Sequence, residues 1–380
     1  MAEYNGNFRD LTEVELGALA ARAALQRTGV RPAQINHTVF GNALQTSGNA
    51  VYGARHVALK AGLPIEVPAL TLNRLCGSGI QSLISATHLI RGEEADCVLA
   101  GGMENMSQAP HVIRGARSGF RLGEGKLEDS LMVALMDTYC GLYMAQTAEK
   151  IAGERDISRR EQDAFALLSQ QRAETAHQAG KFKDEIEPVT VKQGRKEIIV
   201  SEDDHRRPET TLEGLARLSP AFGREDSVTA GNASGIVDGA AAVVVSANPD
   251  AGGHKPLGRI VAWGVVGVEP SIMGIGPVPA TRLALKNAGL SLKEIDLVEV
   301  NEAFAAQYLA VEKDLGLDRE RVNVNGGAIA LGHPLGATGT RLVLTLLLEL
   351  RRRKGRFGLA TACIGGGQGI AIIVESASRG

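Results

Sequence analysis

Apolar and polar positions along the chain alternate between helical and strand-like periods. Leu16, Leu19, Ala20 and Ala23 recur at spacings of three and four residues and predict an amphipathic helix over residues 13–28. Short apolar runs of strand length follow this helix and others like it. Strands that alternate with helices predict an α/β fold with parallel sheets covered on both faces.

This pattern occurs twice. The helix over 13–28 and the stretch 34–43 match a helix over 280–289 and the stretch 294–303. The other matching pairs are the strands 69–75 and 321–325, the helix 80–90 and a helix ending at Leu350, the strands 97–102 and 358–363, and the strands 240–246 and 370–375. We therefore expect two pseudo-symmetric α/β/α halves packed against each other.

Residues 106–236 interrupt the repeat. They are rich in charged residues and glycine, and they predict helices over 139–155 and 159–179. An insertion of this size is expected to form a loop domain that covers or binds a ligand. The predicted organisation is an N-terminal half of residues 1–105 plus 237–257, an inserted domain of 106–236, and a C-terminal half of 258–380.

One predicted element has no counterpart. The second half opens with a strand over 259–268, whereas the first half reaches its first helix almost directly after Met1. In a doubly wound sheet the first strand tends to be central, so its loss should be costly. We therefore expect that the natural protein starts upstream of Met1, and an intact mass matching 380 residues would contradict this.

Composition excludes several functional classes. The net charge is −2, which does not suggest binding to nucleic acid or a membrane surface. No apolar run approaches the roughly 18 residues of a membrane span. The chain has four well-separated cysteines without a CxxC pair, so neither a disulfide framework nor a metal site is expected. Such a chain fits a reducing compartment, and we expect the cytoplasm.

Cys76 is the first candidate for chemistry. It lies between a predicted strand and a predicted helix and is followed by Gly77, Ser78 and Gly79. A helix N-terminus lowers the pKa of a thiol, and the N–H of Cys76 can point at an acyl oxygen. The alternative is a buried structural cysteine at a tight turn.

Three further residues occupy comparable places. His333 begins a predicted helix, where it could activate a thiol or simply cap the helix. Cys363 ends a strand and enters a glycine run that could approach a ligand or a phosphate, although the following strand excludes a dinucleotide fingerprint. Asn301, at an equivalent strand end, could hold a catalytic water. All four residues follow strand ends, where open α/β sheets bind ligands.

Several motifs together resemble the thiolases, the acetyl-CoA acetyltransferase family. They are residues 73–79, 101–106, 230–235, 301–306, 332–336 and 363–369, in family order, and the similarity runs from about residue 8 to the C-terminus. The resemblance implies a five-layer αβαβα fold. The strand that opens the family pattern is absent, in agreement with the missing first strand.

The resemblance also implies catalytic roles. Cys76 attacks a thioester and is acylated, with His333 as its activating partner, and Cys363 exchanges the α-proton of the second acetyl group. Asn301, through a water, and His333 form one oxyanion site. The N–H groups of Cys76 and Gly365 form the other.

Coenzyme A is expected as a substrate rather than a permanent cofactor. Ser234 is expected at the pantetheine arm and Arg207 near the adenine end. Residues expected along the channel are Met144, Leu218, Met273, Ala303 and Phe304. Tyr143 stands where many relatives that act on acetyl-CoA carry histidine, which leaves the preferred acyl length open. A homotetramer or dimer is expected, with residues 106–130 as a candidate interface loop.

Two other functions are compatible with parts of the sequence. A decarboxylating condensing enzyme shares the fold but lacks the second catalytic cysteine, so Cys363 argues against it. A non-catalytic coenzyme A-binding protein is supported only by the missing strand.

Overall fold

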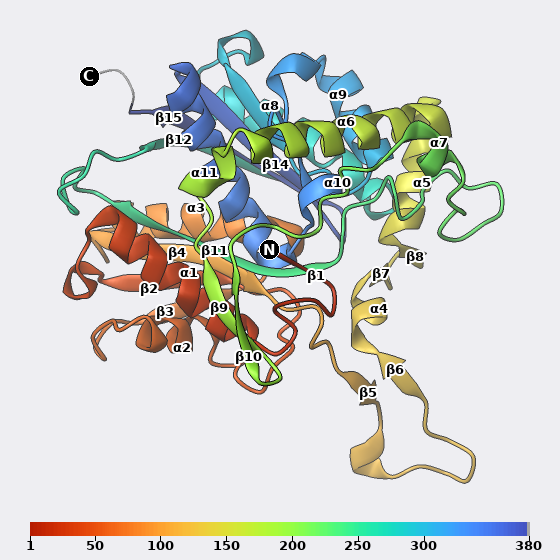
Figure 1. The fold of residues 1–380 in the computed structure, drawn as a ribbon, viewed down its shortest axis with the longest axis horizontal. Helices are drawn as coiled ribbons and strands as arrows, with labels where there is room; N and C mark the ends of the chain where they lie inside the picture. The colour runs from red at the N-terminus through yellow and green to blue at the C-terminus, as the bar shows by residue number, and fades with distance from the viewer. Residues whose placement is uncertain (378–380) are drawn as a thin grey trace.

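Two mixed β-sheets form the frame of the chain, and the computed structural model describes residues 1–377 of it (Figure 1). The first sheet has the order β1-β11-β4-β2-β3 and the second β12-β15-β14-β13. Their strands are β1 (Ala2–Glu3), β2 (His37–Gly41), β3 (Ala69–Leu72), β4 (Cys97–Glu104), β11 (Val237–Ser246), β12 (Gly258–Gly267), β13 (Leu297–Val300), β14 (Phe357–Ile364) and β15 (Gln368–Ser376). The predicted C-terminal half runs to Gly380, and residues 378–380 lie outside the described part of the chain.

The prediction of parallel sheets holds for only part of each sheet, because both sheets are mixed. Strands β2, β3 and β4 run parallel, as do β13 and β14. Strands β1, β11, β12 and β15 pair antiparallel with their neighbours. In the second sheet the reason is local: only residues 365–367 join β14 to β15, and a turn this short permits only antiparallel pairing.

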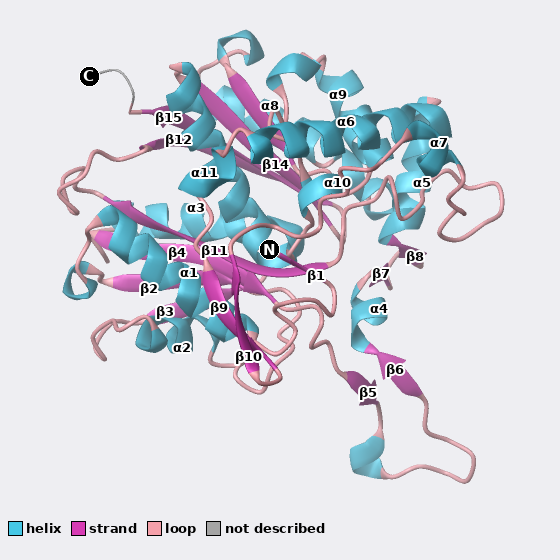
Figure 2. Cartoon of the chain, viewed as in Figure 1, coloured by secondary structure: helices cyan, strands magenta, loops and turns pink. Residues whose placement is uncertain are grey.

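Helices cover both outer faces of the sheets and fill the space between them (Figure 2). The outer helices are α1 (Glu13–Thr28) and α2 (Gly53–Lys60) on the first sheet, and α8 (Pro277–Ala288) and α9 (Ala305–Leu315) on the second. The middle layer consists of α3 (Ser78–Arg91) and α11 (Leu335–Arg353). The predicted five-layer αβαβα fold is therefore confirmed.

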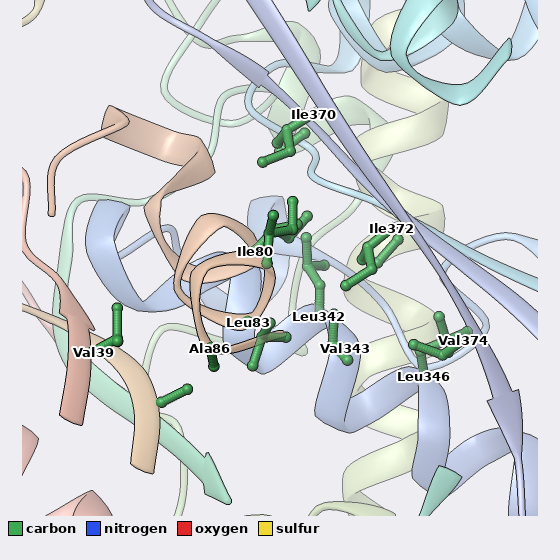
Figure 3. Close-up of a cluster of buried hydrophobic side chains, with 14 of the residues drawn as sticks. Val39, Ile80, Leu83, Ala86, Leu342, Val343, Leu346, Ile370, Ile372 and Val374 are labelled. Atoms are coloured by element: carbon green, nitrogen blue, oxygen red, sulfur yellow. The ribbon is translucent and has the colours of Figure 1, made fainter. Parts of the chain in front are cut away.

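The largest core cluster crosses between the two sheets (Figure 3). It joins Ile80 and Leu83 of α3 to Leu342 and Leu346 of α11, and it continues into Ile372 of β15. The two middle helices approach closely at glycines, because a Cβ atom added at Gly79 would lie 2.4 Å from the backbone nitrogen of Thr340. This contact holds the starts of both helices at the centre of the molecule.

Between β4 and β11 the chain leaves the sheets. Its elements are β5 (His111–Ile113), β6 (Leu127–Asp129), α4 (Ser130–Ala134), β7 (Met136–Asp137), β8 (Leu142–Tyr143), α5 (Met144–Arg155), α6 (Arg159–Gln178), β9 (Val189–Gln193), β10 (Lys196–Val200) and α7 (Leu212–Ala216). The part with β5, β6 and α4 extends away from the sheets as an arm (Figure 1). Among the described residues, no helix has the length and hydrophobicity to cross a bilayer.

Two predicted elements differ from the observed ones. The strand expected over 321–325 is a 3-10 turn, Arg319–Arg321, followed by a single bridge between Val298 and Val322, because the glycines after it turn the chain into the short α10 (Ala328–Leu331). The helix expected over 139–155 begins only at Met144. The residues before it form the antiparallel pair β7–β8, and Gly141, with a φ of 73°, lies in the turn between these strands.

The first half does open with a strand, but a short one. β1 has two residues, whereas β12, the opening strand of the second half, has ten. Both lie at the edges of their sheets, so the prediction that the first strand is central is wrong.

Candidate active site

Cys76 lies in a sharp turn between β3 and α3. The turn is a 3-10 helix, Leu75–Gly77, and Leu75 has a φ of 45°, a left-handed conformation that costs roughly 1 kcal/mol for this residue type. The side chain of Asn73 holds the turn, because its Oδ1 accepts from the N–H of Leu75 at 2.8 Å. The strained turn places Cys76 directly before the free N–H groups of α3.

Two backbone N–H groups donate hydrogen bonds to the sulfur of Cys76. They belong to Gly365, in the turn between β14 and β15, and to Cys76 itself, and both lower the pKa of the thiol. Burial outweighs them, and the negative charge of Glu104 adds to the effect, so the pKa of Cys76 rises to about 11. The predicted low pKa of Cys76 is therefore wrong. Both predicted donors of the second oxyanion site nevertheless meet at this sulfur.

Cys363 lies near the end of β14 and is fully buried. Burial raises the pKa of its thiol, and the nearby charge of Cys76 raises it further. Its apolar neighbours are Met273 and Ala303, with Met144 and Phe304 at the border of the cluster. Four of the five predicted channel residues therefore surround the second thiol.

His333 comes from the other half of the molecule and is buried. Its Nδ1 lies 2.6 Å from Oγ1 of Thr338, and that hydroxyl donates to the carbonyl of Pro334 at 3.0 Å. The hydroxyl can therefore accept only from Nδ1–H, which leaves Nε2 as the acceptor atom of the ring. Burial, followed by the charge of Arg341, lowers the pKa of His333 to about 3, so the ring is neutral.

Asn301 lies beside the acceptor nitrogen of His333. Its Nδ2 is 3.3 Å from Nε2, and its backbone N–H donates to the carbonyl of Thr361. Its Oδ1 is buried and has no partner among the described residues. A buried oxygen without a partner fits a site that holds a water or a polar substrate atom.

The loop 230–235 packs beside the apolar cluster. Its Ser234 donates a backbone N–H to the carbonyl of Ala303 at 3.0 Å, and Gly235 accepts from the N–H of His333 at 2.9 Å. Ser234 is therefore close to both the channel residues and the histidine, and its contact with a substrate arm stays a prediction.

The remaining predicted ligand residues lie farther out. Leu218 is 39% exposed and packs on Gly231, where an added Cβ atom would lie 2.5 Å from its Cδ1. Arg207 is exposed and forms an ion pair with Glu3 at 3.2 Å. Their exposure suits the solvent end of a long ligand, but the structure does not bring Arg207 into contact with the thiols.

Two polar residues were missed in the sequence. Thr338 fixes the tautomer of His333, and the only sequence signal was a hydroxyl five residues later at the same helix start. Glu104 is buried and accepts from Asn42 Nδ2 and from the N–H groups of Ala43, Leu44 and Gly336, at 2.9–3.0 Å. It ties the start of α11 to the end of β4, and in the sequence its motif 101–106 gives only a family resemblance.

We expect Thr338→Val to lower kcat about 10- to 100-fold with a smaller change in KM. Valine preserves the shape of the side chain but leaves the buried Nδ1–H of His333 without an acceptor, so the ring is no longer held in one tautomer. Steady-state thiolysis assays would measure both constants. Thr338→Ser, which keeps the hydroxyl, is the control, and an unchanged kcat in the valine variant would contradict the role.

Comparison with known proteins shows the family of this chain. The thiolase N-terminal domain family matches residues 1–248, and the thiolase C-terminal domain family matches residues 254–376. The chain is 53% identical to human mitochondrial 3-ketoacyl-CoA thiolase over 98% of this chain and 95% of the relative. It is 48% identical to an acetyl-CoA acetyltransferase of Shinella zoogloeoides, over 99% and 96%. The crystal structure of the human enzyme in complex with CoA superimposes with a TM-score of 0.96 at 53% identity, over 99% of this chain and 95% of that one.

Proposed function

Because this chain belongs to the thiolase family and is a thiolase-type acyltransferase, we propose that it cleaves 3-ketoacyl-CoA with free CoA and catalyses the reverse condensation. The observation that carries the proposal is the meeting of Cys76, the N–H of Gly365 and the buried thiol of Cys363. A nucleophile, an oxyanion donor and a second proton carrier are the groups this chemistry needs.

In the first step, the sulfur of Cys76 attacks the 3-keto carbon, and its proton passes to Nε2 of His333. The carbonyl oxygen becomes an oxyanion and accepts from the N–H groups of Cys76 and Gly365. The bond between carbons 2 and 3 then breaks, which leaves an acyl group on Cys76 and the enolate of acetyl-CoA. The enolate oxygen accepts from Nε2–H of His333 and from a water held by Asn301, and carbon 2 takes the proton of Cys363.

In the second step, the thiol of free CoA attacks the acyl group on Cys76. Its proton restores Cys363, and Cys76 leaves and recovers its proton from His333. Thiols and thioesters exchange at similar free energy, so both directions use the same groups. The raised pKa of Cys76 and the lowered pKa of His333 mean that the resting site is neutral. The proton therefore moves as the carbon–sulfur bond forms, rather than before substrate binds.

We expect the enzyme to act on 3-ketoacyl-CoA substrates whose acyl chains are longer than that of acetoacetyl-CoA. The identity to the human 3-ketoacyl-CoA thiolase, 53%, is higher than the identities to the acetyl-CoA acetyltransferases of Shinella zoogloeoides and Pseudomonas aeruginosa, 48% and 50%. The ring of Tyr143 stacks on the ring of Phe222, with 5.2 Å between the ring centroids. Tyr143 directly precedes Met144, which belongs to the channel cluster. Thiolysis rates for acetoacetyl-CoA and a longer 3-ketoacyl-CoA would test this, and activity confined to acetoacetyl-CoA would contradict it.

The arm supports assembly into a dimer or tetramer. Several of its apolar side chains are exposed, and Leu122 is fully exposed. Within residues 106–130 the other exposed apolar side chains are Ile113, Phe120 and Leu127. A second copy packed on residues 106–130 would bury them, and a monomeric mass by light scattering would contradict this. Location in the cytoplasm stays a prediction, because the relatives include an enzyme named mitochondrial as well as a bacterial one.

A further inference from the structure

One buried carboxylate joins the two halves of the site. Glu104 is the last residue of β4, and its side chain accepts four hydrogen bonds. Its Oε1 accepts from Asn42 Nδ2 at 2.9 Å and from the N–H of Leu44 at 3.0 Å. Its Oε2 accepts from the N–H of Ala43 at 3.0 Å and from that of Gly336 at 2.9 Å. Three donors belong to the first half of the chain and the fourth to the second half.

These donors define the protonation state of Glu104. All four are N–H groups, and two of them meet each carboxylate oxygen. A proton on either oxygen would face a donor, so the arrangement suits the ionised form. Burial raises the pKa of Glu104 to about 7, although the N–H groups of Leu44, Ala43 and Gly336 lower it. The side chain is therefore a carboxylate at pH 8.

In the first half, the loop 42–44 supports the turn that carries the nucleophile. Asn73 Nδ2 donates to the carbonyl of Ala43 at 2.9 Å, and Asn73 Oδ1 accepts from the N–H of Leu75 at 2.8 Å. Leu75 is the residue of left-handed conformation directly before Cys76. The hydrogen bonds of Glu104 therefore reach the strained turn through one peptide group and one side chain.

In the second half, the same carboxylate holds the start of α11. Gly336 is the second residue of that helix, and its N–H is one of the donors that a helix start leaves free. A Cβ atom added at Gly102 would lie 1.8 Å from the carbonyl oxygen of Gly336, so the helix begins directly on β4. Thr338, which holds His333, follows two residues later. Glu104 therefore helps to set the position of the histidine.

The charge of Glu104 also acts on the nucleophile. Burial is the main cause of the raised pKa of Cys76, and the negative charge of Glu104 raises that pKa further. A like charge near a thiolate disfavours the ionised form. The other titratable or charged side chains that act within the site are His333, Cys363, Arg341 and Glu13. Glu104 is therefore a fixed negative charge that opposes ionisation of the thiol.

We propose that Glu104 is a positioning residue of the reaction, which fixes the turn of Cys76 against the start of α11 and keeps Cys76 protonated until substrate binds. It acts through the loop 42–44, through Gly336 and through its charge. The inference rests on the proposed function, because it assigns a role within the same site. Its two parts can be separated, since the length of the side chain serves the hydrogen bonds and the ionised state supplies the charge.

Two substitutions separate these parts. Glu104→Gln keeps the length but removes the charge, and its NH₂ group cannot accept from the pair of donors that it faces. Glu104→Asp keeps the charge but is one methylene shorter, so it cannot reach both pairs of donors. Both variants should lower kcat for thiolysis at pH 8 about 10- to 100-fold, with a smaller change in KM.

Alkylation of Cys76 measures the charge alone. Cys76 is half-buried, so iodoacetamide can reach it, and mass spectrometry of the peptide that contains Cys76 gives the rate. Loss of a like charge lowers the pKa of a thiol and raises its thiolate fraction. We expect Glu104→Gln to be alkylated about 3- to 10-fold faster than wild type at pH 8, and Glu104→Asp within about twofold of wild type.

Glu13→Gln is the matched control. Glu13 is also a buried carboxylate, and it accepts from the hydroxyls of Thr46 and Ser47 in the continuation of the same loop. Its substitution loosens that loop but leaves the charge of Glu104 in place. This variant should keep the wild-type rate of alkylation within about twofold. If it were alkylated as fast as Glu104→Gln, loosening rather than charge would explain the effect, and the proposal would be overturned.

The wild-type protein supplies a measurement that does not depend on the folding of a variant. Well below the pKa of a thiol, alkylation becomes about 100-fold faster over two pH units. Between pH 6 and pH 8 Glu104 becomes charged and opposes this rise, so we expect an increase of only about 10- to 30-fold. Glu185 and Glu299, whose pKa values burial raises to about 7 and about 8, interact with Arg341 instead.

The outcomes distinguish this proposal from the proposed function. A full 100-fold rise in the wild-type protein, wild-type alkylation of Glu104→Gln, or wild-type kcat in either Glu104 variant would each overturn the positioning role. Absence of thiolysis by the folded wild-type protein would instead refute the proposed function. Alkylation needs no turnover, so it would still show whether the charge of Glu104 controls the thiol of Cys76.

Discussion

Cys76→Ala is expected to lower the rate of thiolysis at least about 10⁴-fold, the largest effect of any single change in this chain. Without the sulfur no acyl-enzyme can form, and the N–H groups of Cys76 and Gly365 remain with nothing to stabilise. The measurement is thiolysis of a 3-ketoacyl-CoA, together with intact mass after incubation with acetyl-CoA. Wild-type protein should gain one acetyl group, and the variant none.

Cys140→Ala is the matched control for that experiment. Cys140 lies in the turn between β7 and β8, is half-buried and forms no disulfide. It should retain wild-type activity and acetylation. Acetylation of the Cys76→Ala protein at the wild-type level would place the nucleophile elsewhere and refute the mechanism.

Cys363→Ala is expected to lower turnover about 10²- to 10⁴-fold, the range of a lost general acid or base. The variant should still accept an acetyl group on Cys76, because the nucleophile, His333 and both oxyanion donors are intact. It should fail to exchange the α-proton of acetyl-CoA, since no thiol remains to carry that proton. Deuterium uptake into acetyl-CoA, followed by NMR, separates this loss from a general defect.

Cys97→Ala serves as its control, because Cys97 is also buried but packs in the outer core beneath α1 and α2. That variant should lose some stability and keep α-proton exchange. If Cys363→Ala exchanged the α-proton at the wild-type rate, the second thiol would have no role in proton transfer.

The sequence predicted the layers of helices and sheets, but it did not predict the direction in which the strands pair within each sheet. Helical periodicity placed α1 over 13–28, where a capping box between Thr12 and Glu15 starts the helix and Gly29 ends it. Periodicity does not show strand direction, so the antiparallel β11 and β15 were missed. The strand expected over 321–325 also failed, because an apolar alternation that short cannot be distinguished from a turn.

The sequence predicted those site residues whose positions are set by the ends of strands. Cys76, Asn301 and Cys363 follow or end strands, and His333 precedes a helix, so their approach follows from the repeat. The pKa of Cys76 was not predictable, because burial depends on packing from both halves. Glu104 and Thr338 were missed for the same reason, since their partners become visible only when the chain is folded.

In the middle layer the two halves of the chain pack against each other as two subunits of a dimer would, but they are joined in one polypeptide. Each half contributes one central helix, α3 or α11, and the apolar face of each helix is buried by the other (Figure 3). This is the arrangement of an isologous subunit interface, held within a single polypeptide. A half produced alone would expose that face to water and would stay soluble only by pairing with a copy of itself. The catalytic groups come from both sides of this interface, so neither half carries a working site by itself.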